Sequence, residues 1–331
     1  MRIGLIGTGR IGAFHAVTLA GLPAVTGIVV HDADERSGRS VADQVGAEYA
    51  GDLDGLLGAG LDGVVIAAPT AAHAELILAA GRAGLATFCE KPVAGTLAET
   101  DAVLAALDGS TVPLHIGFQR RFDAGYQAVR EAIADGRLGW THTLRACTSD
   151  PTPPHPGYIP GSGGIFRDCS VHDYDIIRWV TGREVTEVYA TGANRGEDFF
   201  AAADDVDTGV TLLTLDDGTL ATCTATRYNG AGYDVRLEAC GSKATLVAGL
   251  TDRTPLTSAE GASWPADTPY PGFMERFLDA YRAELTAFTE VVKGERPSPC
   301  TAHDARAALA IAEAATRSRT EGRPVRLAPA A

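Results

Sequence analysis

The sequence predicts an N-terminal α/β domain with a parallel sheet, followed by an α+β domain built on a large, mostly antiparallel, open sheet. Up to about residue 120, short apolar runs alternate with Ala-rich segments of helical length. From Trp140 onward the strand candidates are longer and alternate between apolar and polar residues, and Asp-Asp-Gly at 216–218 marks a hairpin turn. We therefore expect one domain over residues 1–120 and a second over residues 121–331, with C-terminal helices that can pack back on the first domain.

Each expected strand of the first domain is a short apolar run that ends in turn residues. These runs are RIGLIG (2–7), VTGIVVHD (25–32), DGVVIAAP (62–69), ATFCEKP (86–92) and PLHIGF (113–118). The longer strands of the second domain are THTLRACTS (141–149), VTEVYATGA (185–193), the hairpin 207–227 and YDVRLEAC (233–240). Residues 150–164 carry so many Pro and Gly that we expect an irregular loop. Helices are expected over 167–179, 273–293 and 302–321.

The composition is that of an ordinary globular chain and argues against several kinds of partner. Of 331 residues, 45% are hydrophobic and 21% are charged, and the formal net charge is -14. Binding to nucleic acid needs Lys and Arg arranged in a stripe, which this acidic chain lacks. Without a secretory leader pattern or an apolar run near the ~20 residues of a membrane span, we expect a cytoplasmic protein that binds neither membrane nor nucleic acid.

The cysteines are scattered along the chain and predict neither a zinc site nor a redox pair. None of them forms a C-x-x-C spacing, which such sites commonly use. We expect buried free thiols and no bound metal. The six positions are Cys89, Cys147, Cys169, Cys223, Cys240 and Cys300.

A Gly-x-Gly-x-x-Gly motif at Gly7, Gly9 and Gly12 lies between the first strand and the first helix. Such glycines permit a tight turn and a close approach to a pyrophosphate, which then binds the free N–H groups at the helix N-terminus. Asp32 ends the second strand about 20 residues later, where a carboxylate binds the ribose hydroxyls of NAD and repels the 2′-phosphate of NADP. We therefore expect a Rossmann domain that binds NAD. Arg36 could accommodate a phosphate, so NADP stays an alternative.

Two further segments carry titratable side chains. Lys91 follows an expected strand, so it should lie at the carboxyl edge of the sheet, where a cis bond before Pro92 would aim its side chain. On the expected helix over 167–179, residues three and four apart share a face, so Asp168, His172 and Asp175 should point the same way. Oxidising a secondary alcohol by hydride loss needs a base for the hydroxyl proton, and a neutral histidine titrates in a suitable range.

The three motifs together resemble those of the glucose-fructose oxidoreductase and inositol dehydrogenase family. They are the glycine motif, Glu90-Lys91-Pro92, and Asp168-x-x-x-His172 ahead of Asp175. The segments GFQRRFDAGY (117–126), SGGIF (162–166) and GYDV (232–235) are similar to those of bacterial inositol 2-dehydrogenases. The resemblance covers almost the whole chain and implies the same two-domain fold.

The resemblance also implies roles for individual residues. His172 would be the base, Asp168 would orient its imidazole or stabilise the protonated form, and Lys91 would bind the nascent oxyanion. The implied cofactor-binding residues are Gly7, Gly9, Arg10, Ile11, Gly12, Asp32, Ala68, Pro69, Glu90 and Lys91. The implied substrate-binding residues are Lys91, Arg121, Tyr158, Asp168, His172, Asp175 and Tyr233. His73 is expected to have only a helix-start or supporting role.

The resulting expectation is an NAD-dependent dehydrogenase that oxidises a secondary hydroxyl of a cyclic polyol, foremost myo-inositol to scyllo-inosose. Several inositol dehydrogenases carry a basic residue before the Asp150-Pro151 pair, where this chain has Ser149. That difference leaves a pyranose sugar or its derivative, with NAD or NADP, as an alternative substrate. A non-catalytic dinucleotide-binding sensor is a second alternative. The resemblance further implies a homo-oligomer, a tetramer or a dimer, in which the open sheet face packs against a partner.

Overall fold

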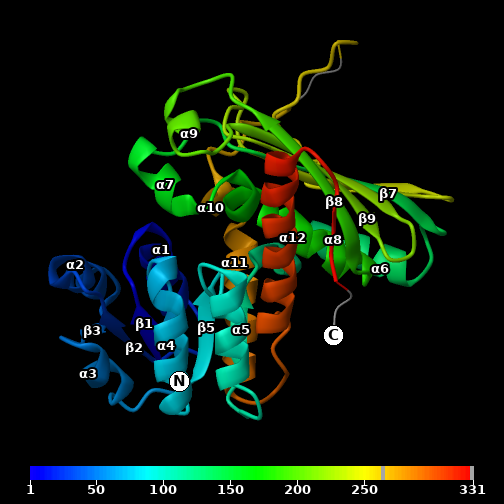
Figure 1. Cartoon of the computed structure of the whole chain (residues 1–331). Helices are drawn as coiled ribbons and strands as arrows, with labels where there is room; N and C mark the ends of the chain where they lie inside the picture. Colours follow the sequence, from blue (N-terminus) through cyan, green and yellow to red (C-terminus); the bar gives the residue numbers. More distant parts are fainter. Residues whose placement is uncertain (262–264, 329–331) are drawn as a thin grey trace. The chain divides into compact units, whose positions relative to one another are not determined.

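The computed structural model describes residues 1–261 and 265–328, and these form two compact units. Unit 1 contains Met1–Gln119 and Tyr281–Arg306, and unit 2 contains Arg120–Ala280 and the chain from Ala307 onward. The chain therefore passes from unit 1 into unit 2, returns to unit 1 and enters unit 2 again (Figure 1). The domain boundary expected after residue 120 stays a prediction, because a compact unit need not fold alone.

Among its described residues, unit 1 contains a fully parallel six-stranded sheet in the order β3-β2-β1-β4-β5-β6. Its strands are β1 (Arg2–Ile6), β2 (Gly27–His31), β3 (Glu48–Tyr49), β4 (Gly63–Ile66), β5 (Ala86–Glu90) and β6 (Leu114–Gly117). Its helices are α1 (Arg10–Ala20), α2 (Glu35–Val45), α3 (Leu53–Leu57), α4 (Thr70–Arg82), α5 (Leu97–Ala106) and, from Tyr281, α11 (Leu278–Val292). Figure 1 shows α4 and α5 side by side.

Helices on both faces bury the short apolar strands of unit 1, as a parallel sheet requires. One core layer joins Leu5 of β1 and Val30 of β2 to Leu19 of α1. Leu285 and Phe288 of α11 belong to the same layer, although they lie far along the chain. Because all strands run parallel, their carboxyl ends meet at one edge of the sheet, where α/β proteins bind ligands.

Among its described residues, unit 2 contains a seven-stranded sheet in the order β12-β11-β7-β10-β9-β8-β13. Neighbouring strands pair antiparallel, except β7 and β10, which run parallel. The strands are β7 (Thr141–Ser149), β8 (Val185–Ala193), β9 (Thr208–Leu215), β10 (Leu220–Thr226), β11 (Asp234–Gly241), β12 (Thr245–Ala248) and β13 (Val325–Arg326). The helices are α6 (Ala124–Ala134), α7 (Ile159–Ser162), α8 (Val171–Thr181), α9 (Phe199–Ala202), α10 (Phe273–Arg276) and, from Ala307, α12 (Ala302–Glu321).

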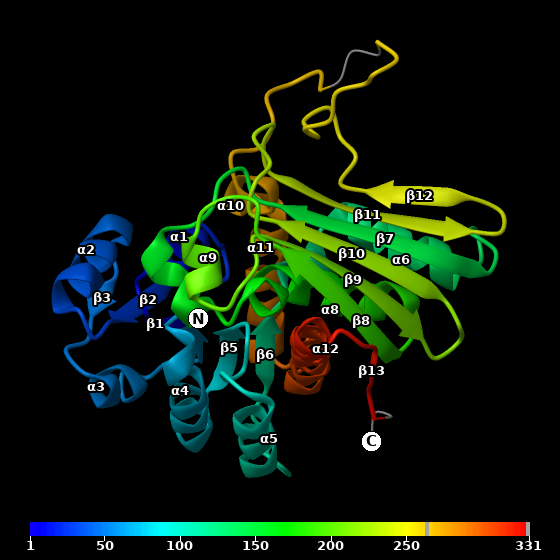
Figure 2. The same cartoon turned by 45° about the horizontal axis from the view of Figure 1, so that its top comes forward.

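The two faces of the unit 2 sheet differ. Helix α8 packs on β7 and β10 (Figure 2), and its Tyr174 hydroxyl lies 2.8 Å from the Thr211 hydroxyl of β9. On the opposite face, the strands leave apolar side chains that are 40–44% exposed. We call these residues the open-face patch: Tyr189, Val210, Leu212 and Leu220. Within the described ranges, no helix has the length and apolar character of a membrane span.

The main strands and helices lie where the sequence predicts them, but three expectations are wrong. The expected loop over 150–164 contains a 3-10 turn at Pro156–Tyr158 and helix α7, because proline is tolerated where a helix begins. The helix expected over 273–293 is interrupted between α10 and α11. The helix expected over 167–179 begins with a π-helical turn at Phe166–Ser170 and becomes α-helical only at Val171. Asp168 lies in this π turn, so the α-helical spacing used to predict its shared face with His172 does not apply there.

Candidate active site

The turn between β1 and α1 lies at the carboxyl edge of the unit 1 sheet. Gly7 has a φ of 93°, and a Cβ on it would lie 2.5 Å from the backbone nitrogen of Ala68. A Cβ on Gly12 would lie 2.1 Å from the Gly7 carbonyl oxygen. By contrast, a Cβ on Gly9 would meet no atom of the described chain within 4 Å. The fold therefore requires Gly7 and Gly12, whereas Gly9 keeps space open in front of α1.

Helix α1 presents its N-terminus to this space. Its N-cap is Gly9, which has no side chain to cap the first N–H groups, and its first turn, with Arg10 and Ile11, contains no acidic residue. Free N–H groups and the positive end of the helix dipole favour an anion. Ala68 and Pro69 form the connection from β4 into α4 beside this turn. The space over Gly9 and the uncapped helix therefore fit the pyrophosphate of a dinucleotide.

Asp32 directly follows β2 at the same edge. Its Oδ2 accepts hydrogen bonds from the Thr8 backbone nitrogen at 2.6 Å and from the Thr8 hydroxyl at 2.8 Å, and its Oδ1 accepts from the Asp34 nitrogen at 2.8 Å. Burial acts to raise the pKa of Asp32, but these hydrogen bonds together outweigh it and hold the pKa below its ordinary value. The ionised carboxylate has about four acceptor positions, so one remains for a ribose hydroxyl.

Lys91 directly follows β5, so its backbone also lies at this edge, and the Lys91–Pro92 peptide bond is cis. The preceding Glu90 is held by His15 of α1, whose Nε2 lies 2.7 Å from Glu90 Oε1. His15 is fully buried and packs edge-on against the ring of Phe88. The His15–Glu90 contact therefore fixes the segment from which the lysine projects.

His73, in the first turn of α4, joins two loops at the same edge. Its Nδ1 lies 2.6 Å from the Pro92 carbonyl oxygen, and its Nε2 lies 2.9 Å from the Ala68 carbonyl oxygen. The buried ring thus ties the loop after β4 to the loop after β5.

In unit 2, Arg227 and Tyr158 hold the carboxylate of Asp168. Arg227 Nη2 donates to Asp168 Oδ2 at 2.7 Å, and the Tyr158 hydroxyl donates to Oδ1 at 2.9 Å. The second terminal nitrogen of Arg227 donates to Asp150 Oδ2 at 2.9 Å. Because the Arg227 side chain is only 3% exposed, these groups form a buried charge network. The partly buried His172 follows Asp168 by four residues, in the first turn of α8.

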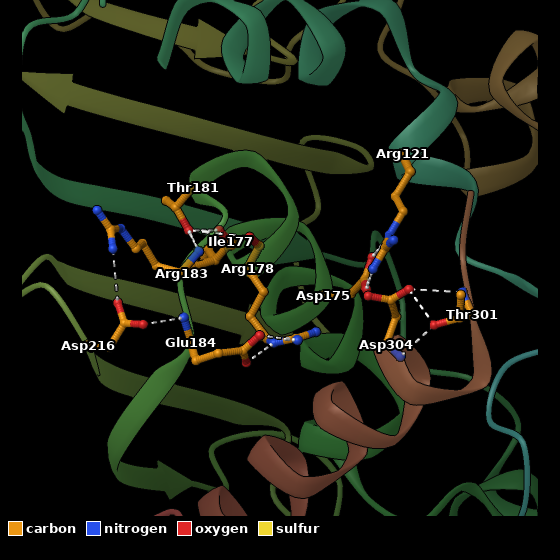
Figure 3. A network of polar contacts seen from close by, with 10 residues as sticks. All are labelled: Arg121, Asp175, Ile177, Arg178, Thr181, Arg183, Glu184, Asp216, Thr301 and Asp304. Atoms are coloured by element: carbon orange, nitrogen blue, oxygen red, sulfur yellow. Dashed lines mark hydrogen bonds and ion pairs between the residues drawn. The ribbon is translucent and has the colours of Figure 1, made fainter. Parts of the chain in front are cut away.

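Arg121 and Asp175, both expected at the substrate site, form a buried ion pair with each other (Figure 3). Arg121 Nε donates to Asp175 Oδ2 at 2.9 Å, and Nη2 donates to Oδ1 at 2.5 Å. The neighbouring Arg120 donates from Nη1 to Asp173 Oδ1 at 2.5 Å and from Nη2 to the Thr148 hydroxyl at 2.9 Å. Burial raises the pKa of Asp173 despite the charge of Arg120. Two adjacent arginines thus anchor α8.

The two tyrosines expected at the substrate site differ in exposure. Tyr158 is 47% exposed, but its hydroxyl faces Asp168; burial of that hydroxyl and then the Asp168 charge raise the pKa of Tyr158. Tyr233 immediately precedes β11 and is buried, and burial raises its pKa despite the nearby charge of Arg120. Both phenols therefore keep their proton at neutral pH, and the Tyr158 proton is committed to Asp168.

The expected site residues are divided between the two units. The unit 1 group is Gly7, Gly9, Arg10, Ile11, Gly12, Asp32, Ala68, Pro69, Glu90 and Lys91. The unit 2 group is Arg121, Tyr158, Asp168, His172, Asp175 and Tyr233. Within unit 2, a hydrogen bond joins Tyr158 to Asp168, and an ion pair joins Arg121 to Asp175.

Sequence reasoning missed three residues that hold these groups in place: His15, Asp150 and Arg227. The partners of Arg227 lie 59 and 77 residues away along the chain, and the partner of His15 lies 75 residues away. The sequence feature that points to Arg227 is its position directly after an apolar strand. Such a signal does not identify a partner.

Two family descriptions match this chain. Residues 1–118 match the oxidoreductase family with an NAD-binding Rossmann fold, and residues 126–247 match the GFO/IDH/MocA C-terminal domain. The chain therefore belongs to the GFO/IDH/MocA family of oxidoreductases, as the motifs predict, and NAD is the cofactor of its Rossmann unit.

Particular relatives carry more specific names. The chain is 35% identical to a myo-inositol 2-dehydrogenase of Thermotoga maritima, over 99% of this chain and 98% of the relative. A crystal structure of a myo-inositol dehydrogenase from Corynebacterium glutamicum has a TM-score of 0.91 and 34% identity, covering 100% of this chain and 99% of that one. A scyllo-inositol dehydrogenase from Lactobacillus casei, with bound NAD(H) and scyllo-inositol, has a TM-score of 0.90 and 28% identity, covering 98% of each chain.

Proposed function

We propose that this protein oxidises a secondary hydroxyl of a cyclic polyol with NAD, and that myo-inositol, converted to scyllo-inosose, is its substrate. The proposal rests most heavily on one observation: Lys91 and the Asp168-His172 pair are present in a chain whose relatives over nearly the full length include inositol dehydrogenases. A sensor that only binds dinucleotide has no need of all three groups. The glycine turn and Asp32 support NAD, whereas Arg36, exposed at the start of α2, supports the NADP alternative less directly.

In the proposed mechanism the alcohol loses a proton from oxygen and a hydride from carbon. His172 accepts the proton, because a neutral imidazole is a suitable base near neutral pH. Asp168 places a negative charge by the imidazolium that forms, and Lys91 stabilises the developing alkoxide. Bound NAD supplies the acceptor for the hydride. No step requires a metal ion.

Polyol recognition needs several partners, because each hydroxyl taken from water must find a hydrogen bond. We propose Arg121, Tyr158, Asp175 and Tyr233 for this task, beside the three catalytic groups. The Tyr158 proton is donated to Asp168, so this phenol would accept a hydrogen bond from a substrate hydroxyl rather than donate one. The paired charges of Arg121 and Asp175 hold each other in one orientation, which suits recognition of a single stereoisomer.

The test is a cofactor-reduction assay at basic pH with NAD or NADP. The panel contains myo-inositol, scyllo-inositol, chiro-inositol, glucose, galactose and xylose, and the control is His172→Ala. Turnover of myo-inositol with NAD, lost in the variant, is the expected result. Preference for a pyranose would replace the proposed substrate and keep the reaction class. Binding of NAD without any turnover would favour the sensor alternative.

We also propose that two copies of the chain associate through the open-face patch, as part of a dimer or a tetramer. Four apolar side chains gathered on one sheet face are costly to leave in water. Leu212→Glu places a charge in the patch and should reduce the mass measured by light scattering after gel filtration. Leu256→Glu, at an apolar residue that is 37% exposed outside the patch, is the control and should leave the mass unchanged. A monomeric wild-type protein would contradict the proposal.

We further propose the cytoplasm as the site of action. All six cysteines lie among the described residues and none forms a disulfide there, and proteins of reducing compartments commonly lack disulfides. Localisation of a tagged protein, with a periplasmic or secreted location as the contrary outcome, tests this.

A further inference from the structure

Asp150 and Arg227 lie side by side because of the parallel pair in the unit 2 sheet. Strands β7 and β10 run in the same direction, with Ser149 aligned with Thr226. The next residue of each strand is therefore Asp150 in one and Arg227 in the other. The Asp150 nitrogen donates to the Thr226 carbonyl at 2.9 Å, which continues the pairing by one step. Topology alone thus brings these two charged residues together.

The π-helical turn before α8 adds Asp168 to this pair. This turn contacts β10, and Arg227 reaches Asp168 with one terminal nitrogen and Asp150 with the other. Tyr158 closes the network from the opposite oxygen of Asp168. Two further titratable groups lie near this network: the thiol of Cys169, whose Sγ lies 3.9 Å from Asp150 Oδ2, and the buried phenol of Tyr233, which interacts electrostatically with Asp150.

One buried guanidinium therefore serves two carboxylates. Burial acts to lower the pKa of Arg227, but the surrounding negative groups raise it by more. The net pKa is therefore raised, and the guanidinium stays charged. Burial raises the pKa of Asp150 more than Arg227 lowers it. A carboxylate buried without such a cation would be costly, so Arg227 accounts for the presence of Asp168 in this partly enclosed place.

We propose that Arg227 is a positioning residue of the dehydrogenase site, which holds the carboxylate of Asp168 in place and balances its charge. This inference rests on the proposed function, in which Asp168 works with His172. Arg227 does not touch the reacting atoms in this scheme. It acts through Asp168, and Asp150 fixes the other side of its guanidinium.

The test compares Arg227→Met with Arg227→Lys and with Arg178→Met. Methionine removes the charge and both hydrogen bonds, whereas lysine keeps the charge but lacks the two-pronged geometry. Arg178 is the control, because its side chain is only 10% exposed and forms a two-pronged ion pair in the same unit with Glu184, whose side chain is 44% exposed (Figure 3). All variants are first compared by thermal unfolding, and NAD affinity is measured by fluorescence titration.

Two readouts follow over a range of pH. The first is kcat/KM for the best polyol, which should fall about 100-fold in Arg227→Met, since small misplacements of catalytic groups cost this much. Its acid limb should move to higher pH by about one unit, because loss of a nearby positive charge favours proton uptake in the site. Arg227→Lys should keep the acid limb at the wild-type pH but have a lower kcat/KM. Arg178→Met should keep both the wild-type acid limb and the wild-type kcat/KM.

The second readout needs no substrate. Modification of His172 by diethylpyrocarbonate requires the neutral ring, so its pH midpoint, followed by mass spectrometry of the His172 peptide, should shift upward in Arg227→Met. If the midpoint shifts in Arg227→Met but the wild-type protein oxidises no polyol, the proposed function is refuted and the role of Arg227 is retained. An unchanged midpoint and acid limb in Arg227→Met would overturn the inference. If that variant does not fold, wild-type kcat/KM in Arg227→Lys would overturn it instead.

Discussion

The glycine turn of unit 1 and the arginine pairs of unit 2 position polar groups in different ways. In unit 1, Gly7 and Gly12 let backbone segments approach closely, so the groups beside these glycines are mostly backbone N–H and carbonyl groups. In unit 2, Arg120, Arg121 and Arg227 are almost fully buried and hold carboxylates through side chains alone. A backbone site tolerates changes that spare its close contacts, whereas a buried ion pair loses stability when either partner is removed.

The largest effect is expected for Asp173→Ala in unit 2. It would leave the 2%-exposed Arg120 buried without its carboxylate, and breaking such a pair costs about 3–5 kcal/mol. The free energy of unfolding, measured by urea titration, should fall by this amount. Glu238→Ala removes the partner of the exposed Arg145 and should cost less than about 1 kcal/mol. Equal losses in the two variants would show that burial does not set the cost.

A smaller effect is expected from alanine at the glycines of unit 1. Gly12→Ala places a Cβ against the Gly7 carbonyl and should lower the free energy of unfolding by about 1–3 kcal/mol, as overpacking typically does. Gly9→Ala meets open space, so its stability should stay within about 0.5 kcal/mol of wild type. Both variants should bind NAD at least about tenfold more weakly in fluorescence titrations. Unchanged NAD affinity in Gly9→Ala would mean that the space over Gly9 is not the pyrophosphate site.

The smallest effect is expected for the charge of Asp32. Its pKa is lowered in the folded chain, so its contribution to stability is present above its ordinary pKa and is lost as the pH falls through the folded value. The difference in free energy of unfolding between wild type and Asp32→Asn should therefore be positive at pH 7 and shrink below about pH 4. Urea titrations across this range measure it. A difference that does not change with pH would point to altered hydrogen-bond geometry instead of charge.

The features that the sequence predicts are those determined by residues close together in the chain. The glycine turn and Asp32 follow from short-range rules about backbone freedom and strand ends, so the sequence predicts both. Strands of eight or nine residues such as β7 and β9 show their alternation, whereas β3 and β13 have two residues each and show no period. The π turn at Phe166–Ser170 differs from an α-helix in that each hydrogen bond spans five residues instead of four, and its composition does not predict this difference.

The charge network of unit 2 could not be predicted in the same way. Asp168, His172 and Asp175 were found because they lie close together in one motif, but the arginines that hold the carboxylates come from distant segments. Their pairing depends on the strand order and on the parallel pair β7–β10, which follow from tertiary packing. Local sequence patterns therefore identify the carboxylates but not the distant cation that offsets the cost of burying them.

The return of the chain into unit 1 has a consequence for folding during synthesis. Leu285 and Phe288 complete the apolar layer formed with β1 and β2, and the Ile116 nitrogen of β6 donates to the Cys300 carbonyl at 3.0 Å. These partners leave the ribosome only after nearly all of unit 2 has been made. Domains usually fold in the order of their synthesis, N-terminal first. Here the first unit to be translated must wait, with part of one face of its sheet uncovered, until the second is almost finished.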